Sequence, residues 1–150
     1  MARTPQNKLV ILVDTREQRP LALPNSKRAT LSTGDYSVEG YEKLIAVERK
    51  SHADFVGCVA QGRDRFEREL ARLTMYEYPA LVLECSMADI LAGVRFSEVH
   101  PHAAVGSLIA WSVKYRVPVW LAGDRRTAAA TVRKILEDAV KYIQEKEDGA

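Results

Sequence analysis

Residues 44–54 read Leu-Ile-Ala-Val-Glu-Arg-Lys-Ser-His-Ala-Asp, and this stretch decides the fold. Its four leading apolar residues form a run typical of a buried strand, and the run leads directly into the charged residues 48–50. Ser51 then suits the N-cap of a helix, with the acid Asp54 in the first turn. The stretch predicts a buried strand that is followed at once by a helix, with three charged side chains at the junction.

Apolar runs, periodic apolar faces and turn residues on either side of this stretch predict the other elements. They indicate strands over 9–13, 35–38, 44–47, 80–84 and 119–122, a loop over 18–27, and helices from Ser51 to Gly62, around 66–73, from Ser86 to Gly93, around 105–113 and over 132–143. Helices alternate with strands in the second half, which favours an α/β fold. We expect a mixed sheet of five or six strands with helices on both faces.

The 150 residues fit one domain, over 9–144, with a flexible leader at 1–8 and a frayed tail at 145–150. The hydrophobic fraction of 47% is that of an ordinary globular protein, and the net charge of +2 permits a nucleic-acid partner without requiring one. Cys58 and Cys85 lie far apart in apolar surroundings, so we expect reduced thiols. Neither a signal peptide nor a membrane span is evident, which predicts a cytoplasmic protein, or a nuclear one in a eukaryote.

Four acids lie at or just beyond the ends of predicted strands, namely Asp14, Asp35, Glu48 and Asp54. Carboxylates brought together in this way suit Mg²⁺, which prefers oxygen ligands. Lys50 lies two residues beyond Glu48, so on a strand both side chains project from one face and an ammonium stands beside the metal. The alternative is a solvated strand end with a turn acid, because an acid followed by Glu-x-Lys also occurs by chance.

Three blocks in order distinguish the two readings: Val13-Asp14-Thr15-Arg16-Glu17, Gly34-Asp35-Tyr36, and Val47-Glu48-Arg49-Lys50 with Asp54. Together they resemble the nuclease domain of the XPF/Hef/Mus family of structure-specific endonucleases, and the resemblance covers most of residues 9–140. It implies a restriction-endonuclease-like fold and a Mg²⁺-dependent DNA endonuclease, with Mn²⁺ able to substitute. The implied substrates are branched, flap or fork DNA.

The resemblance also implies a role for each matching residue. Asp35 and Glu48 match the principal metal-binding carboxylates, and Lys50 matches the catalytic lysine. Arg49 is implied to contact phosphate or brace the acidic cluster. Asp14 and Asp54 match outer acids that hold the metal or the basic side chains, and we count Asp14 among the metal ligands.

Several basic residues are candidate contacts to the DNA backbone. Arg63 matches the family and lies after the acidic block, and Arg16 belongs to the first block, where an Arg-Glu structural pair with Glu17 is an equal alternative. The loop pairs Lys27-Arg28 and Arg125-Arg126 are open between phosphate contacts and plain surface charge. His100-Pro101-His102 lacks a ligand pattern and is better explained as the start of a helix.

The family resemblance further implies pairing of nuclease domains, as a homodimer or as a heterodimer with a related chain. The candidate interface is the apolar helix that contains Leu108, Ile109, Trp111 and Val113, with the helix over 132–143 beside it. The helix-hairpin-helix module of many family members does not fit within the chain, which leaves the bound DNA structure open. Two rival functions remain: a non-catalytic DNA-binding partner subunit, and a junction resolvase of the same fold.

Overall fold

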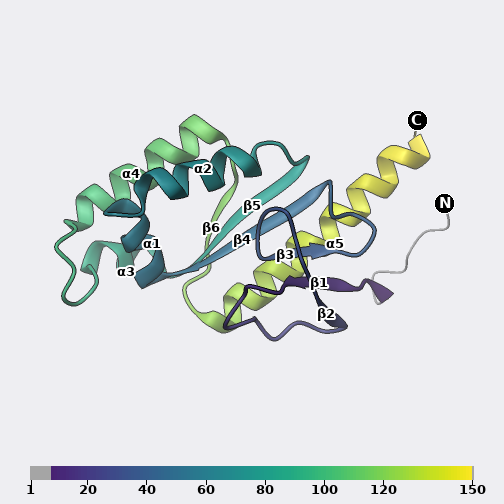
Figure 1. The fold of residues 1–150 in the computed structure, drawn as a ribbon, viewed down its shortest axis with the longest axis horizontal. Coiled ribbons are helices and arrows are strands. Elements are labelled where there is room, and N and C mark those ends of the chain that lie inside the picture. Colours follow the sequence, from purple (N-terminus) through teal and green to yellow (C-terminus); the bar gives the residue numbers. More distant parts are fainter. Residues whose placement is uncertain (1–7, 150) are drawn as a thin grey trace.

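The computed structural model describes residues 8–149, and Figure 1 shows its ribbon. The strands in this range are β1 (Ile11–Asp14), β2 (Ser26–Ala29), β3 (Tyr36–Val38), β4 (Ile45–Ser51), β5 (Tyr78–Glu84) and β6 (Val119–Leu121). The helices are α1 (His52–Val59), α2 (Arg63–Leu73), α3 (Met87–Ala92), α4 (Pro101–Tyr115) and α5 (Arg125–Gly149). None of these helices is both long and apolar enough to span a membrane.

The six strands form one mixed sheet in the order β2-β1-β3-β4-β5-β6. β3 runs antiparallel to both of its neighbours, whereas β4, β5 and β6 are parallel to one another. β4 and β5 pair along their whole length, from Ile45 opposite Tyr78 to Ser51 opposite Glu84. Helical crossovers between parallel strands place helices on the faces of the sheet, which is the predicted architecture.

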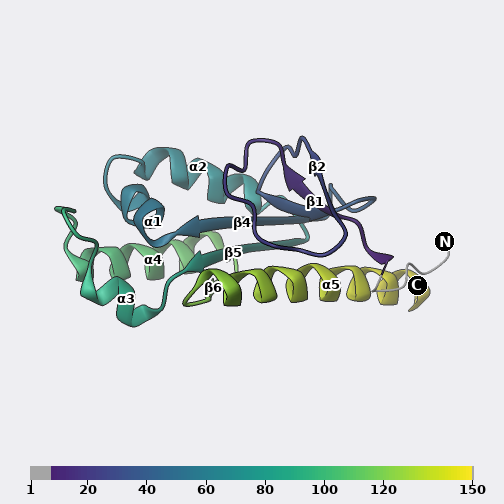
Figure 2. The ribbon, with the colours of Figure 1, turned by 90° about the horizontal axis from the view of Figure 1, so that it is seen from below.

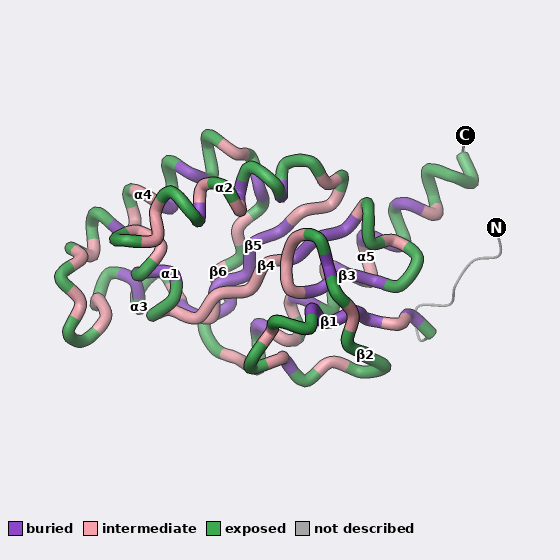
Figure 3. Tube along the Cα trace, viewed as in Figure 1, coloured by how far each residue is buried: buried purple, intermediate pink, exposed green. Residues whose placement is uncertain are grey.

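Alternation along the central strands builds two hydrophobic cores on opposite faces of the sheet. Ile45, Val47 and Val82 belong to the core beneath α5, whereas Ala46 and Leu83 belong to the core beneath α1, α2 and α4. Figure 2 shows α1 and α2 on one side of β4 and α5 on the other, and Figure 3 shows that β4 and β5 consist of buried and intermediate residues. The predicted mixed sheet with helices on both faces is confirmed.

The residues predicted to begin helices also lie at helix starts in the structure. The Ser51 side chain accepts a hydrogen bond from the Asp54 backbone N–H, and Ser86 with Asp89 forms a capping box at the start of α3. His100 caps α4, with Pro101 in its first turn. The His-Pro-His stretch is therefore a helix start.

Three predictions of local structure need correction. Residues 26–27 were assigned to a loop but belong to β2, a polar edge strand that pairs with β1 through its backbone and carries no apolar signal. Glu48 does not end its strand, because pairing with β5 extends β4 to Ser51. α5 continues to Gly149, so residues 145–149 are helical where a frayed tail was expected. Of the predicted leader, residues 1–7 lie outside the described residues.

Candidate active site

The second half of β4 presents its charged side chains on alternate faces of the sheet. Glu48 and Lys50 share one face, as predicted, and Lys50 Nζ lies 3.5 Å from Glu48 Oε1. Arg49 points to the opposite face. Both Glu48 and Lys50 are largely covered, with 14% and 16% of their side chains exposed. The strand therefore holds a carboxylate and an ammonium side by side in a poorly solvated position.

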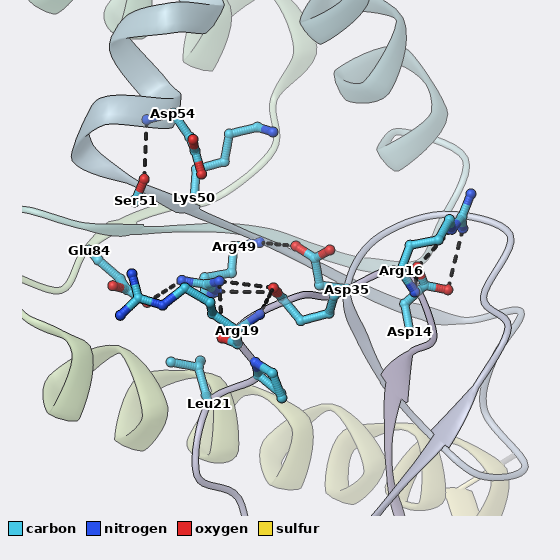
Figure 4. Close-up of polar contacts among 12 residues, drawn as sticks. Asp14, Arg16, Arg19, Leu21, Asp35, Arg49, Lys50, Ser51, Asp54 and Glu84 are labelled. Carbon is cyan, nitrogen blue, oxygen red and sulfur yellow. Dashed lines mark hydrogen bonds and ion pairs between the residues drawn. The ribbon is translucent and has the colours of Figure 1, made fainter.

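The backbone conformation of Gly34 lets the loop place Asp35 next to β4. Gly34 has φ +80°, and a Cβ at this position would lie 3.1 Å from the Val47 carbonyl oxygen, so a larger residue would push the loop away. The Asp35 backbone N–H donates to the same carbonyl at 2.8 Å. The Asp35 Oδ2 atom in turn accepts from the Arg49 backbone N–H at 2.8 Å, as Figure 4 shows. The predicted convergence of Asp35 with Glu48 and Lys50 is thus built by backbone contacts.

The surface is hollowed over these side chains. A pocket of about 430 Å³ is lined by Asp35, Glu48, Lys50 and Asp54 together with residues 16–19. A second pocket of about 240 Å³ shares the first three residues and extends toward Asp14 and α2. A ligand that enters the larger pocket therefore meets Asp35, Glu48 and Lys50 together with further acidic side chains.

Burial and mutual repulsion disfavour charge on both carboxylates. Burial raises the pKa of Glu48 to about 8, and the neighbouring charge of Asp35 adds to the effect. Burial likewise raises the pKa of Asp35 to about 6, against the hydrogen bond from Arg49. For Lys50, burial alone would lower the pKa, but the nearby charges, with Glu48 the largest, leave it raised. The site holds a protonated lysine beside two acids that are costly to ionise.

Arg49 lies at the centre of an ion-pair network that lines the larger pocket. It pairs with Glu17 at 3.0 Å and with Glu84 at 2.5 Å, and it donates to the Arg19 carbonyl at 3.2 Å. Arg125 approaches the same Glu84 at 3.5 Å. The predicted bracing role fits these contacts, whereas the predicted phosphate contact of Arg49 stays a prediction. Glu17 pairs with Arg49 and not with Arg16, so the suggested Arg16–Glu17 pair is wrong.

Both carboxylate oxygens of Asp14 accept hydrogen bonds from neighbouring residues of the fold. Its Oδ2 accepts from Arg16 Nε at 2.8 Å, and its Oδ1 accepts from the Leu31 backbone N–H at 2.9 Å. Within residues 8–149, no group of three or more Asp, Glu, His or Cys side chains is arranged to hold a metal ion. Asp14 lines the smaller pocket together with Asp35 and Glu48, and its role as a metal ligand stays a prediction. Asp54 lies exposed in the first turn of α1.

The predicted DNA contacts divide into two groups. Arg16 has 69% of its side chain exposed and lines both pockets. The others line neither of these pockets: Lys27 pairs with Glu39, and Arg28 donates to the carbonyls of Asp14 at 2.9 Å and Glu17 at 2.7 Å. Arg63 donates to Ser107 at 2.9 Å and lies over the Trp111 ring at 4.8 Å, so it joins α2 to α4.

Sequence reasoning missed three residues at the site, namely Glu69, Glu84 and Arg125. Glu69 reaches Lys50 from α2, and Glu84 reaches Arg49 from the end of β5. Arg125 had been considered only as a surface or phosphate-binding residue, yet it also donates to the carbonyls of Arg19 and Pro20. Strand register places Glu84 near Arg49, since Ser51 lies opposite Glu84, but this register has no local sequence signal.

Comparison with protein families finds that the ERCC4 domain model matches residues 13–135, most of the chain. The chain belongs to the ERCC4 domain family. This ERCC4 domain contains all the residues of the pocket described above, and the family predicted from the three sequence blocks is confirmed.

Two solved structures resemble the ERCC4 domain in fold. One is XPF from Aeropyrum pernix, with a TM-score of 0.69 and 20% identity over 87% of this chain and 61% of that one. The other is XPF from Aeropyrum pernix in complex with DNA, with a TM-score of 0.70 and 20% identity over 89% and 66%. The chain thus spans about two thirds or less of the length of these structures. No curated protein sequence matches the chain.

Proposed function

We propose that the chain is a metal-dependent endonuclease that hydrolyses DNA phosphodiester bonds at branched, flap or fork structures. The observation that carries the proposal is the placement of Asp35, Glu48 and Lys50 around one pocket in an ERCC4 domain. Restriction-endonuclease-like chemistry requires two carboxylates and a cationic donor beside the scissile phosphate, and these residues supply them.

The residues present fit a hard divalent cation, Mg²⁺ or Mn²⁺. Mg²⁺ in nucleases is held by one or two carboxylates together with water and phosphate oxygens, so a third protein ligand is not needed. Asp35 and Glu48 would hold the ion, and their raised pKa values mark a place where added positive charge is favourable. When bound, the ion polarises the phosphoryl oxygen and stabilises the leaving oxyanion.

The protein's own residues then have separate tasks. The Lys50 ammonium donates a hydrogen bond that orients the attacking water and offsets charge on the phosphate. Arg16, exposed at the rim of both pockets, contacts the DNA backbone. Asp14 holds Arg16, and Arg49 braces the floor through Glu17 and Glu84. Asp54 stands at the opening beside Lys50 and shapes the charge there.

A cleavage panel tests this function. Labelled flap, fork, four-way junction, duplex and single-stranded DNA are incubated with the chain in Mg²⁺ and in Mn²⁺. We expect cutting of the branched substrates and little cutting of plain duplex. Cleavage restricted to the four-way junction would instead indicate a resolvase. Binding of branched DNA without any cleavage would indicate the non-catalytic partner subunit, although the site retains both acids and the lysine that such a subunit lacks.

We also propose that the domain works as a dimer, with itself or with a related chain. The predicted interface on α4 is changed by the structure, because Leu108 and Trp111 are buried in the core. The exposed apolar residues nearby are Ile109 (55%) and Val113 (74%) on α4 and Trp120 (52%) on the edge strand β6. An apolar groove of about 600 Å³ lies between β5, β6 and α5. Light scattering at micromolar concentration, with and without branched DNA, tests pairing: a mass that stays at one chain contradicts a homodimer.

A further inference from the structure

The Lys50 ammonium is held by groups from two different elements. Its Nζ lies 3.5 Å from Glu48 Oε1 on its own strand and 3.5 Å from Glu69 Oε2 on α2. The Phe66 ring, also on α2, has its centroid 5.4 Å from the same nitrogen. A lysine side chain has a flexible four-carbon stem, so its ammonium stays in one place only when its partners fix it. Two of the three partners come from α2.

α2 presents Glu69 from a well-anchored position. Phe66, Leu70 and Leu73 bury one face of the helix in the core beneath α1, α2 and α4. Glu69 follows at the edge of that face with 20% of its side chain exposed, and it lines both the pocket shared with Asp35 and a further pocket behind Lys50. The carboxylate therefore stands against Lys50 on a rigid support.

Stability does not explain a carboxylate at this position. The Glu69 Oε2 atom is buried and has no hydrogen-bond partner within residues 8–149, so its contact with the Lys50 ammonium at 3.5 Å is an ion pair only. The other ion pair, from Arg65 Nε at 3.8 Å, involves a side chain that is 83% exposed and so contributes little. Covering a carboxylate with so few hydrogen bonds costs free energy that one ion pair rarely recovers. A neutral residue here should fold as well or better.

Glu48 and Glu69 differ in what else they do. Glu48 is the acid proposed to hold a cation, and a carboxylate oxygen engaged by a cation is less available to the ammonium. Glu69 is not proposed to bind the cation, so its carboxylate remains available to the Lys50 ammonium. We propose that Glu69 is a positioning residue whose carboxylate keeps the Lys50 ammonium at the reaction site. This inference rests on the proposed nuclease function and adds to it a residue that touches neither metal nor phosphate.

The first test compares Glu69→Ala, Glu69→Gln and the control Glu67→Ala. Glu67 lies on the same helix but accepts from Tyr115 and pairs with Lys114, away from Lys50. We expect Glu69→Ala to slow single-turnover cleavage of a flap DNA in Mg²⁺ about ten- to a hundredfold, as a small misplacement of a catalytic group can. DNA affinity and thermal midpoint should not fall. Glu69→Gln keeps an acceptor oxygen and should recover part of the rate, and Glu67→Ala should cleave at the wild-type rate.

Wild-type cleavage by Glu69→Ala, or an equal loss of rate in the control, overturns the inference. A second measurement decides the matter without activity: crystal structures of the wild-type chain and of Glu69→Ala. The inference expects the Lys50 amine to leave its place above the Phe66 ring in the variant, and an unmoved amine refutes it. If the wild-type chain cuts no DNA, the proposed function fails on its own, and these structures still test the role of Glu69.

Discussion

Replacing Glu48 by glutamine is expected to stabilise the metal-free protein while it abolishes cleavage. The substitution keeps the size of the side chain and removes its charge. In the folded protein that charge is unfavourable, because burial and the neighbouring Asp35 raise the pKa of Glu48 to about 8 from an ordinary 4.5. A site that is electrostatically strained without its cation should gain stability when one acid is neutralised.

The size of the gain follows from the linkage between pKa and folding. One pKa unit corresponds to about 1.4 kcal/mol, so the penalty for ionising Glu48 at pH 8 has an upper limit of about 4 kcal/mol. The raised pKa already includes the attraction of Lys50, but relaxation of the site and entry of water reduce the penalty, and we expect the free energy of unfolding to rise by about 1–3 kcal/mol. For a domain of this size each kcal/mol moves the thermal midpoint by about 2–4 °C.

The pH dependence gives the sign of the effect independently. Between pH 4.5 and 8 the unfolded chain releases the Glu48 proton while the folded chain keeps it, so wild-type stability falls as pH rises through this window. The glutamine variant lacks this contribution. Its advantage over wild type should therefore be small at pH 5 and largest at pH 8.

Thermal and urea unfolding at both pH values, in EDTA and in Mg²⁺, measure these differences. Mg²⁺ should stabilise the wild type, by about 1.4 kcal/mol at ten times its dissociation constant, and should stabilise the variant much less. Glu67→Gln is the control: hydrogen bonding by Tyr115 lowers the pKa of Glu67, so neutralising it brings no gain. A glutamine variant at position 48 that is no more stable than wild type at pH 8, or that gains equally from Mg²⁺, would refute the reasoning.

Four further substitutions test the other parts of the site. Lys50→Ala should lower the cleavage rate at least about a hundredfold with little change in DNA affinity, measured by single-turnover kinetics and by binding without Mg²⁺; loss of binding would make Lys50 an anchor. Arg49→Ala leaves Glu17 without its ion-pair partner and Glu84 with Arg125 alone, so it should lower the free energy of unfolding by about 3–5 kcal/mol, and a fully stable variant would contradict the bracing role. Arg16→Ala should weaken DNA binding and reduce the number of counterions released on binding, measured by salt titration, by about one. Arg63→Ala should instead lower the free energy of unfolding. The reverse pattern in the two measurements would exchange the roles of the two arginines.

The sequence predicted the central parts of the fold because their signals are local. The apolar runs at 45–47 and 80–83 form buried strands, and the cap residues Ser51 and Ser86 begin helices where expected. β2 escaped prediction because its pairing with β1 uses backbone groups beneath exposed polar side chains. Strand ends set by register, such as the end of β4 at Ser51, also have no local signal.

The residues of the site likewise divide into those with a local sequence signal and those placed only by long-range packing. The convergence of Asp35, Glu48 and Lys50 follows from a hairpin and an i, i+2 spacing, so it could be predicted. Glu69 reaches Lys50 only because α2 packs across β4, and the position of that helix depends on distant core contacts. The DNA contact of Arg63, expected from its place in the sequence and its match to the family, stays a prediction, whereas its packing on Trp111 has no local sequence signal.

The most direct test of the central claim is single-turnover cleavage of a labelled flap DNA by the wild-type chain and by Asp35→Asn, each in Mg²⁺ and in EDTA. The account predicts cleavage by the wild type in Mg²⁺ alone, with Asp35→Asn folded and able to bind the same DNA but inactive. Cleavage that persists in EDTA, or near wild-type cleavage by Asp35→Asn in Mg²⁺, would contradict it.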